Sequence, residues 1–169
     1  MSVKRYIADL HLSHKNLATH RGFQDEFYQD EHIIKEWNKV VTGKKDITYI
    51  LGDLTMEKRT NYHLLDRLNG RKVVILGNHD AKNHVPSLLE HVDSVCGSLK
   101  VRYEGFTIML THIPVHPMEF DYRLHYNIHG HIHDLEVSLS DGAADDRYIK
   151  VCAESIDYKP KTLEQLLNN

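Results

Sequence analysis

The sequence predicts an α/β fold in which two stacked, mixed β-sheets are flanked by helices. Short apolar segments alternate with helical segments in the first half of the chain, whereas the second half is mostly strand-like. The length of 169 residues suits one domain with a full hydrophobic core. We therefore expect residues 1–169 to form a single domain.

The first half contains three expected strands, of which the second and third are apolar enough to be buried on both faces. They are VKRYIAD, DITYILGD and RKVVILGNHD. Apolar residues recur every three or four positions from Asp25 to Val41, which predicts an amphipathic helix with Trp37 as its core anchor. Two more helices are expected, one in TNYHLLDRLNG, closed by Asn69-Gly70, and a short one in NHVPSLLEHV.

The second half begins with a hairpin. The segment SLKVRYEGFTIMLTH alternates apolar and polar residues on both sides of Glu104-Gly105, which predicts two strands joined by a tight turn. Further strands are expected in YNIHGHIH and RYIKVCAES, and KTLEQLLNN is expected to form a closing helix with Thr162 near its cap.

Composition limits the classes of function. The net charge of −3 gives no general electrostatic footprint for nucleic acid. No run approaches the roughly 18 apolar residues of a membrane helix, and the first residues do not resemble a signal peptide, so we expect a cytoplasmic protein without a membrane partner. Fourteen histidines stand out, because imidazole is the commonest transition-metal ligand in proteins.

Polar residues follow five of the expected strands at their carboxyl ends, which is the edge where ligands bind in open α/β sheets. The sets are Asp9-Leu10-His11, Gly52-Asp53, Gly77-Asn78-His79-Asp80, Thr111-His112 and Gly130-His131-Ile132-His133. A glycine opens three of them and allows a sharp turn or a close backbone approach. His131 and His133 are two positions apart, so an extended chain would direct both side chains to one side.

Each set has an ordinary explanation by itself. Gly52-Asp53 is a common turn dipeptide, Asn78 or Asp80 could cap a helix, and His112 could be any loop histidine. Unrelated caps and turns would not be expected to carry metal-donor chemistry at the same sheet edge five times. The recurrence therefore favours a metal site over a structural, histidine-rich module.

The order of these sets closely resembles that of the calcineurin-like metallophosphoesterase superfamily. DLHLSHKN, EWNKVV, YILGDL and LNGRKVVILGNHD are similar to its small, single-domain bacterial and phage branch, and the resemblance covers nearly the whole chain. It implies a dinuclear metal-dependent phosphoesterase in which a metal-bridging hydroxide attacks the phosphorus of a phosphodiester. Phosphomonoesters are possible further substrates.

The resemblance also implies roles for individual residues. One metal would be held by Asp9, His11 and His133, the other by Asn78, His112 and His131, and Asp53 would bridge them. His79 would protonate the leaving oxygen or stabilise the transition state, with Asp80 orienting its ring or capping the next helix. The mixed nitrogen and oxygen donors permit Mn, Fe, Zn, Co or Ni, and family habit favours two Mn²⁺ ions.

Substrate contacts are less defined. His14, Arg21 and Arg123 are candidates, the first two on a polar loop after the first donor pair. The chain has no room for the capping domain with which related nucleases grip DNA, so we expect a small phosphate ester as the partner. Alternatives are a phosphomonoesterase or pyrophosphatase acting on nucleotides, and a non-catalytic metal-binding scaffold. The oligomeric state is left open.

Overall fold

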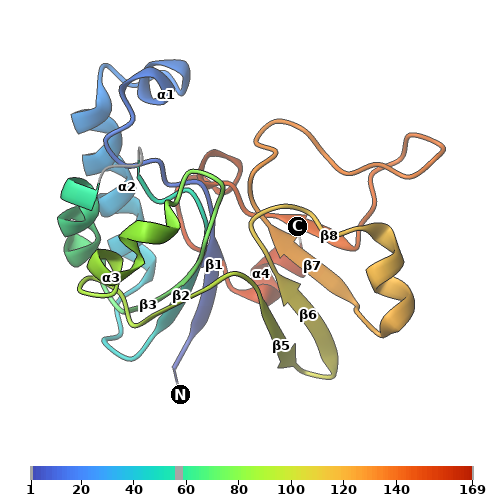
Figure 1. Ribbon diagram of the computed structural model, residues 1–169. Coiled ribbons are helices and arrows are strands. Elements are labelled where there is room, and N and C mark those ends of the chain that lie inside the picture. Colours follow the sequence, from blue (N-terminus) through green and yellow to red (C-terminus); the bar gives the residue numbers. More distant parts are fainter. Residues whose placement is uncertain (1, 56–58, 169) are drawn as a thin grey trace.

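Two four-stranded sheets form the framework of the computed structural model, which describes residues 2–55 and 59–168 (Figure 1). The first sheet is parallel throughout and has the order β1 (Lys4–Ile7), β2 (Ile47–Leu51), β3 (Arg71–Ile75) and β4 (Ser94–Cys96). The second has the order β5 (Leu99–Tyr103), β6 (Phe106–Leu110), β7 (Tyr126–His129) and β8 (Tyr148–Lys150). It is mixed, because β5 and β6 are antiparallel and the other pairs are parallel. The predicted fold class is confirmed.

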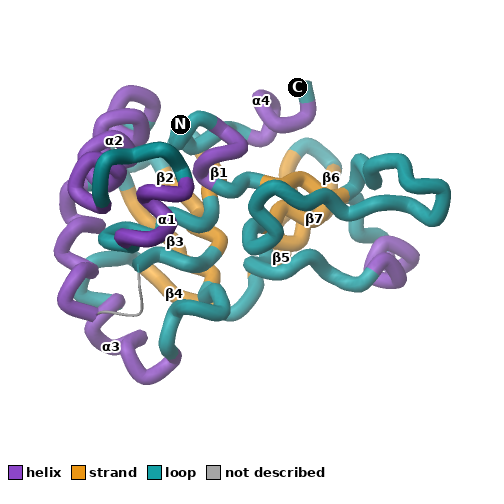
Figure 2. The backbone as a smooth tube through the Cα atoms, turned by 90° about the horizontal axis from the view of Figure 1, so that it is seen from above, coloured by secondary structure: helices purple, strands orange, loops and turns teal. Residues whose placement is uncertain are grey.

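Helices cover one face of the first sheet (Figures 1 and 2). They are α2 (Glu26–Val40), the 3₁₀ helix η1 (Arg59–Arg67), and α3 (Val85–Leu88), which follows η2 (Lys82–His84). The short helix α1 (Lys15–His20) lies above the carboxyl ends of the strands and contacts α2. The predicted helix α2 begins where the Asp25 side chain accepts a hydrogen bond from Tyr28 N. Trp37 is fully buried, and its indole N–H donates to Asn69 O at 3.0 Å, so it anchors the helix as predicted.

The two sheets are joined through the outer edge of β1. Ala8 N donates to Val151 O at 2.8 Å and Ala153 N donates to Ala8 O at 2.9 Å, so the segment after β8 runs beside the end of β1. Farther along, Lys161 pairs with Tyr6 just before α4 (Leu163–Leu167). This seam aligns the carboxyl ends of parallel strands from both sheets along one edge of the molecule (Figure 1).

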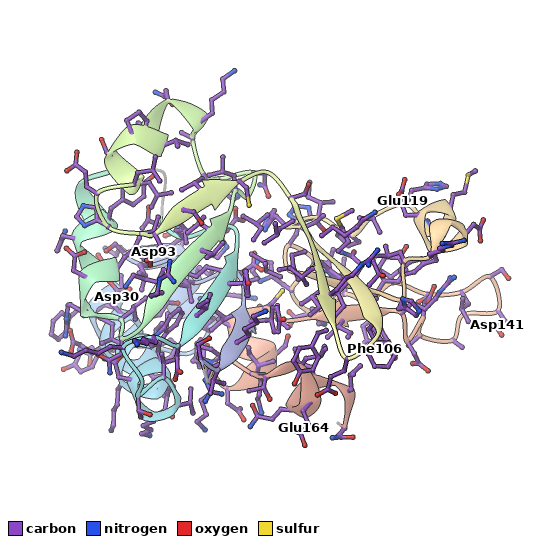
Figure 3. The ribbon with its side chains drawn as sticks, turned by 90° about the horizontal axis from the view of Figure 1, so that it is seen from below. Asp30, Asp93, Phe106, Glu119, Asp141 and Glu164 are labelled. Atoms are coloured by element: carbon purple, nitrogen blue, oxygen red, sulfur yellow. The ribbon has the colours of Figure 1, made fainter. Side chains whose placement is uncertain are left out.

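One apolar core includes residues of the first sheet and residues of the second. Side chains fill the space between the two sheets (Figure 3). Fully buried examples are Ile7, Ile50, Ile108 and Ile128. Among the described residues, no helix combines the length and apolar character that crossing a bilayer requires.

Three local predictions were wrong. The polar loop expected after the first donor pair contains the helix α1. The strand expected over YNIHGHIH ends at His129, because the chain turns away at Gly130. The strand expected over RYIKVCAES ends at Lys150, and its last residues lie in a 3₁₀ helix. The structure also adds short elements that were not predicted: β4, η3 (Pro117–Tyr122) and η4 (Ala153–Ile156).

Candidate metal centre

The carboxyl ends of five strands bring the predicted donors together at the shared edge. Asp9 and His11 follow β1, Asp53 follows β2, Asn78 follows β3, His112 follows β6, and His131 and His133 follow β7. Six of these residues fall into three groups whose potential ligand atoms lie within 4.8 Å of one another, and the seventh, Asn78, contacts His112. The buried groups could bind metal ions.

The first group combines Asp9, His11 and Asp53, which are at most 4% exposed. His11 Nε2 lies 3.8 Å from Asp9 Oδ1 and 3.6 Å from Asp53 Oδ2. Within the described part of the chain, Asp9 Oδ1 and both ring nitrogens of His11 are buried without a hydrogen-bond partner. Unsatisfied polar atoms at this depth are costly, and a bound cation would satisfy the lone pairs that face one another here.

The second group combines Asp53, His112 and His131. His112 Nδ1 lies 2.8 Å from Leu51 O and donates to it, so a neutral ring carries a lone pair on Nε2. That nitrogen faces two oxygen acceptors, Asn78 Oδ1 at 2.7 Å and Asp53 Oδ2 at 3.4 Å. Three electron-rich atoms pointing at one another require either a proton on the ring or a cation between them.

The third group combines Asp9, His133 and Cys152, and the sequence analysis missed the cysteine. His133 Nε2 lies 3.8 Å from Asp9 Oδ1, and His133 Nδ1 contacts Glu154 Oε1 at 2.6 Å. Glu154 was missed as well, although it follows a strand end just as the predicted donors do. A carboxylate behind a ligating histidine fixes the ring and its tautomer.

Three glycines are required by close contacts at the centre. A Cβ atom on Gly77 would lie 2.2 Å from Asp53 Oδ1, and one on Gly130 would lie 2.2 Å from Asp9 Oδ2. A Cβ atom on Gly52 would lie 2.4 Å from His112 Nδ1. The close backbone approach expected from the sequence is therefore present at all three glycines that open a donor set.

The backbone is left-handed at five of the seven predicted donors. The φ angles are 55° for Asp9, 48° for His11, 54° for Asp53, 72° for His131 and 44° for His133. Non-glycine residues adopt this region rarely, and such strain concentrates at functional sites. The extended geometry expected for His131 and His133 is thus wrong. The two side chains reach the centre from a turn and enter different donor groups.

Burial sets the protonation of this centre. Burial raises the pKa of the Asp9 carboxyl and lowers the pKa of His11 to about 3. Burial also opposes charge on His112, but the neighbouring Asp53 carboxylate outweighs it and raises the pKa of this ring. The His11 imidazole is thus available as a neutral ligand, and a nearby cation would restore the charge of Asp9.

The two predicted catalytic residues lie on the loop after β3. His79 is half-buried, its backbone N–H donates to Asp53 Oδ1 at 3.0 Å, and its ring lies 5.8 Å from that of His11. Asp80 is buried and accepts hydrogen bonds from the backbone of Gly77, Asp53 and Leu54 at 2.8, 2.8 and 3.0 Å. It therefore clamps the β2 and β3 loops together. The helix-capping alternative for Asp80 is wrong, because Ala81 occupies the N-cap of η2.

The three predicted substrate contacts are placed differently. His14 caps α1, accepts from Leu17 N at 3.2 Å, and its ring packs edge-on against His11 at 5.5 Å. The Arg21 side chain is only 3% exposed and donates to Asp9 O at 2.7 Å and to Glu154, so it supports the centre from behind. Arg123 follows η3, the helix that carries Glu119, at the outer end of the second sheet (Figure 3).

Proteins similar to this chain include two without an assigned function and one enzyme of similar fold. No family model matches the sequence. The uncharacterized protein MJ1445 of Methanocaldococcus jannaschii is 33% identical over 170 residues, covering 95% of this chain and 87% of that protein. The crystal structure of AQ665, a protein of unknown function from Aquifex aeolicus, has a TM-score of 0.75, 25% identity and 97% coverage of both chains. A structure described as a novel archaeal phosphodiesterase has a TM-score of 0.51 and 14% identity, over 88% of this chain and 81% of its own.

Proposed function

The chain belongs to the family of the Methanocaldococcus jannaschii protein MJ1445, and we propose that it is a metal-dependent phosphoesterase of the calcineurin-like superfamily that hydrolyses small phosphodiesters. The observation that carries this proposal is the set of Asp9 and His11 atoms that are buried beside Asp53 with no hydrogen-bond partner among the residues that the structure describes. Buried lone pairs that converge in this way are stabilised by a bound cation. The similar fold of an archaeal phosphodiesterase supports the choice of reaction.

We propose two divalent ions, with Asp53 shared between them. Asp53 Oδ2 supports this role, because it faces His11 Nε2 at 3.6 Å on one side and His112 Nε2 at 3.4 Å on the other. The remaining donors would divide into two sets, Asp9, His11 and His133 against Asn78, His112 and His131. When bound, the two ions would polarise the phosphate and lower the pKa of a water molecule to near neutrality.

Manganese is our proposal for the metal. The donors are imidazole nitrogens and carboxylate or amide oxygens, which suit Mn and also Fe, Zn, Co or Ni. In the metal-free protein, burial raises the pKa of the nearby Cys152 thiol and so disfavours the thiolate form that binds metals.

Two residues of the loop after β3 would donate the proton to the leaving group and keep the loop in place. We propose that His79 protonates the leaving oxygen, since the hydrogen bond from its backbone N–H to Asp53 fixes it at the edge of the centre. Asp80 would keep that loop in place through its three backbone hydrogen bonds, which makes it a positioning residue. His14, beside His11, remains a proposed substrate contact.

A metal-reconstitution assay tests the proposal. Protein purified with a chelator should be inactive toward bis-p-nitrophenyl phosphate and should regain turnover when Mn²⁺ is added. Comparable turnover without any metal would refute the mechanism. p-Nitrophenyl phosphate, assayed in parallel, measures the monoesterase alternative, and metal binding without turnover of either ester or of a nucleoside diphosphate would favour the scaffold alternative.

Two variants separate metal binding from chemistry. Asp53→Asn should lose both ions, because it removes the charge that the two donor sets share, whereas the exposed Asp141→Asn should keep both. His79→Ala should keep the metals and lose at least about 100-fold in turnover, the usual contribution of a general acid. The exposed His125→Ala is its matched control. A metal-loaded His79→Ala protein with unchanged turnover would exclude His79 as the acid.

A further inference from the structure

A cavity of about 340 Å³ adjoins the candidate centre on the side of α1. His133 and Glu154 line it at the centre, and Leu17, Arg21 and Tyr158 form much of the remaining wall. We call it the Leu17–Tyr158 cavity. Its volume falls at the lower end of the range of about 300–1,000 Å³ that is usual for small-molecule sites.

Arg21 and Glu154 neutralise one another in this wall, and Asp134 adds an exposed carboxylate to it. Arg21 Nη2 contacts Glu154 Oε2, and the other oxygen of Glu154 contacts His133 Nδ1 at 2.6 Å. The Arg21 guanidinium is almost fully buried and lies 5.7 Å from the centroid of the Tyr158 ring. The cavity is therefore a poor place for a second phosphate, and its apolar wall suits an uncharged organic group.

The Leu17–Tyr158 cavity borders the centre at His133. This residue lines the cavity, and its Nε2 lies 3.8 Å from Asp9 Oδ1. The His133 side chain is 35% exposed, in contrast to the buried Asp9. A phosphate held at the centre would consequently have one of its ester substituents directed past His133 toward Leu17.

The opposite side of the centre is also hollow. A second cavity of about 340 Å³ is lined by Asn78 and His112, at the other end of the donor cluster. The centre thus has space on both sides, which is what a phosphodiester with two organic substituents needs. Of the two cavities, the Leu17–Tyr158 cavity is the one with a tyrosine ring in its wall.

We propose that the Leu17–Tyr158 cavity binds an apolar, ring-containing substituent of the phosphate ester. The inference rests on the proposed function, since the centre must hold the phosphate for the cavity to receive its substituent. It assigns Leu17 and Tyr158 to substrate selection, a role that neither the sequence motifs nor the donor geometry supplies.

Binding of two phosphonates tests the inference without turnover. Methylphosphonate and benzylphosphonate present the same charged group and differ in the ring, so the ratio of their dissociation constants on the Mn²⁺-loaded protein isolates the cavity. We expect benzylphosphonate to bind about tenfold more tightly by isothermal titration calorimetry, which corresponds to ~1.4 kcal/mol and to partial burial of one ring.

Leu17→Gln should reduce that ratio to about one, because it keeps a good helix former of similar size and replaces the apolar surface by an amide. Leu89→Gln, at an exposed leucine after α3, is the matched control and should keep the ratio. Thermal unfolding of both variants reports whether they are folded. If Leu17→Gln does not fold, a Tyr158→Leu variant gives a second measurement and should reduce the ratio at least twofold.

The outcomes separate the two hypotheses. Equal binding of both phosphonates to the wild-type protein, or a benzyl preference that survives in the folded Leu17→Gln and Tyr158→Leu proteins, would overturn the assignment of the cavity and leave the phosphate site standing. No binding of either phosphonate to metal-loaded protein would instead count against the proposed function.

Discussion

Replacing Glu154 with glutamine should weaken both the fold and metal binding. The Glu154 carboxylate contacts the nearly buried Arg21 and also His133 Nδ1. Burial opposes its charge, but the hydrogen bond from His133 and the Arg21 guanidinium lower its pKa from 4.5 to about 2. A shift of this size corresponds to roughly 3 kcal/mol of stability at neutral pH. Because glutamine retains one acceptor oxygen, we expect a loss of about 2–3 kcal/mol.

The pH dependence gives a distinctive signature. The folded-state pKa of Glu154 is depressed, so its contribution is complete above its unfolded pKa of about 4.5 and is lost as the pH falls toward 2. The difference in unfolding free energy between the wild-type and Glu154→Gln proteins, measured by urea titration without metal, should therefore shrink over this window. Glu164→Gln, at an exposed position in α4, is the matched control.

Metal affinity provides the second measurement. Glu154 acts through His133, and loss of such a partner usually weakens metal binding 10–100-fold. Mn²⁺ titrations of Glu154→Gln, His133→Ala and the double variant should be non-additive, because the glutamate has no ring to orient once His133 is gone. Unfolding free energy within about 0.5 kcal/mol of wild type, together with unchanged Mn²⁺ affinity, would refute the proposed coupling.

Three further outcomes follow from the geometry. Gly130→Ala should destabilise the apoprotein by about 2 kcal/mol or more, because its Cβ would lie 2.2 Å from Asp9 Oδ2, whereas Gly97→Ala, with open space around its Cβ, should stay within about 0.5 kcal/mol in the same urea titration. Burial lowers the pKa of His129 to about 4, so the free energy of unfolding should fall as the pH drops from about 6.5 to about 4. In His129→Gln this loss of free energy should be smaller by up to roughly 3 kcal/mol. An equal loss in both proteins would contradict the prediction. Mn²⁺ at 100 times its dissociation constant should raise the free energy of unfolding of the wild-type protein by about 2.7 kcal/mol for each bound ion, measured by thermal unfolding. An equal gain in Asp53→Asn would show that the ions bind elsewhere.

The donor cluster could be predicted because one local rule locates it. Parallel strands present their carboxyl ends at the same edge, so Asp9, Asp53 and His112 could be grouped without knowledge of the fold. The amphipathic helix α2 was equally accessible, because the spacing of its apolar residues reports the buried face. The hairpin β5–β6, with its turn at Glu104-Gly105, is also confirmed, because the alternation of apolar and polar residues reports the two faces of a strand.

The remainder depends on contacts between distant segments. Helix α1 buries only Ala18 and has no apolar periodicity to reveal it; Arg21, just after it, is fixed by Asp9 and Glu154 instead. The role of Glu154 required knowing that the segment after β8 pairs with β1. The left-handed turn at His131 depends on packing against Asp9, since His131 N donates to Asp9 Oδ2 at 2.9 Å. The superfamily and its branch, the single domain, the cytoplasmic location and the small-ester partner remain predictions.

The seam between β1 and the segment after β8 has a consequence for biosynthesis. The groups that complete the surroundings of Asp9, which are His131, His133 and Glu154, are translated more than 120 residues after it. A nascent chain that already carries the whole first sheet still lacks three of the seven predicted donors, and contacts this remote in sequence form slowly. Metal binding at the proposed centre would therefore follow synthesis of the segment after β8, and ribosome-stalled chains ending before residue 150 should retain no tightly held manganese.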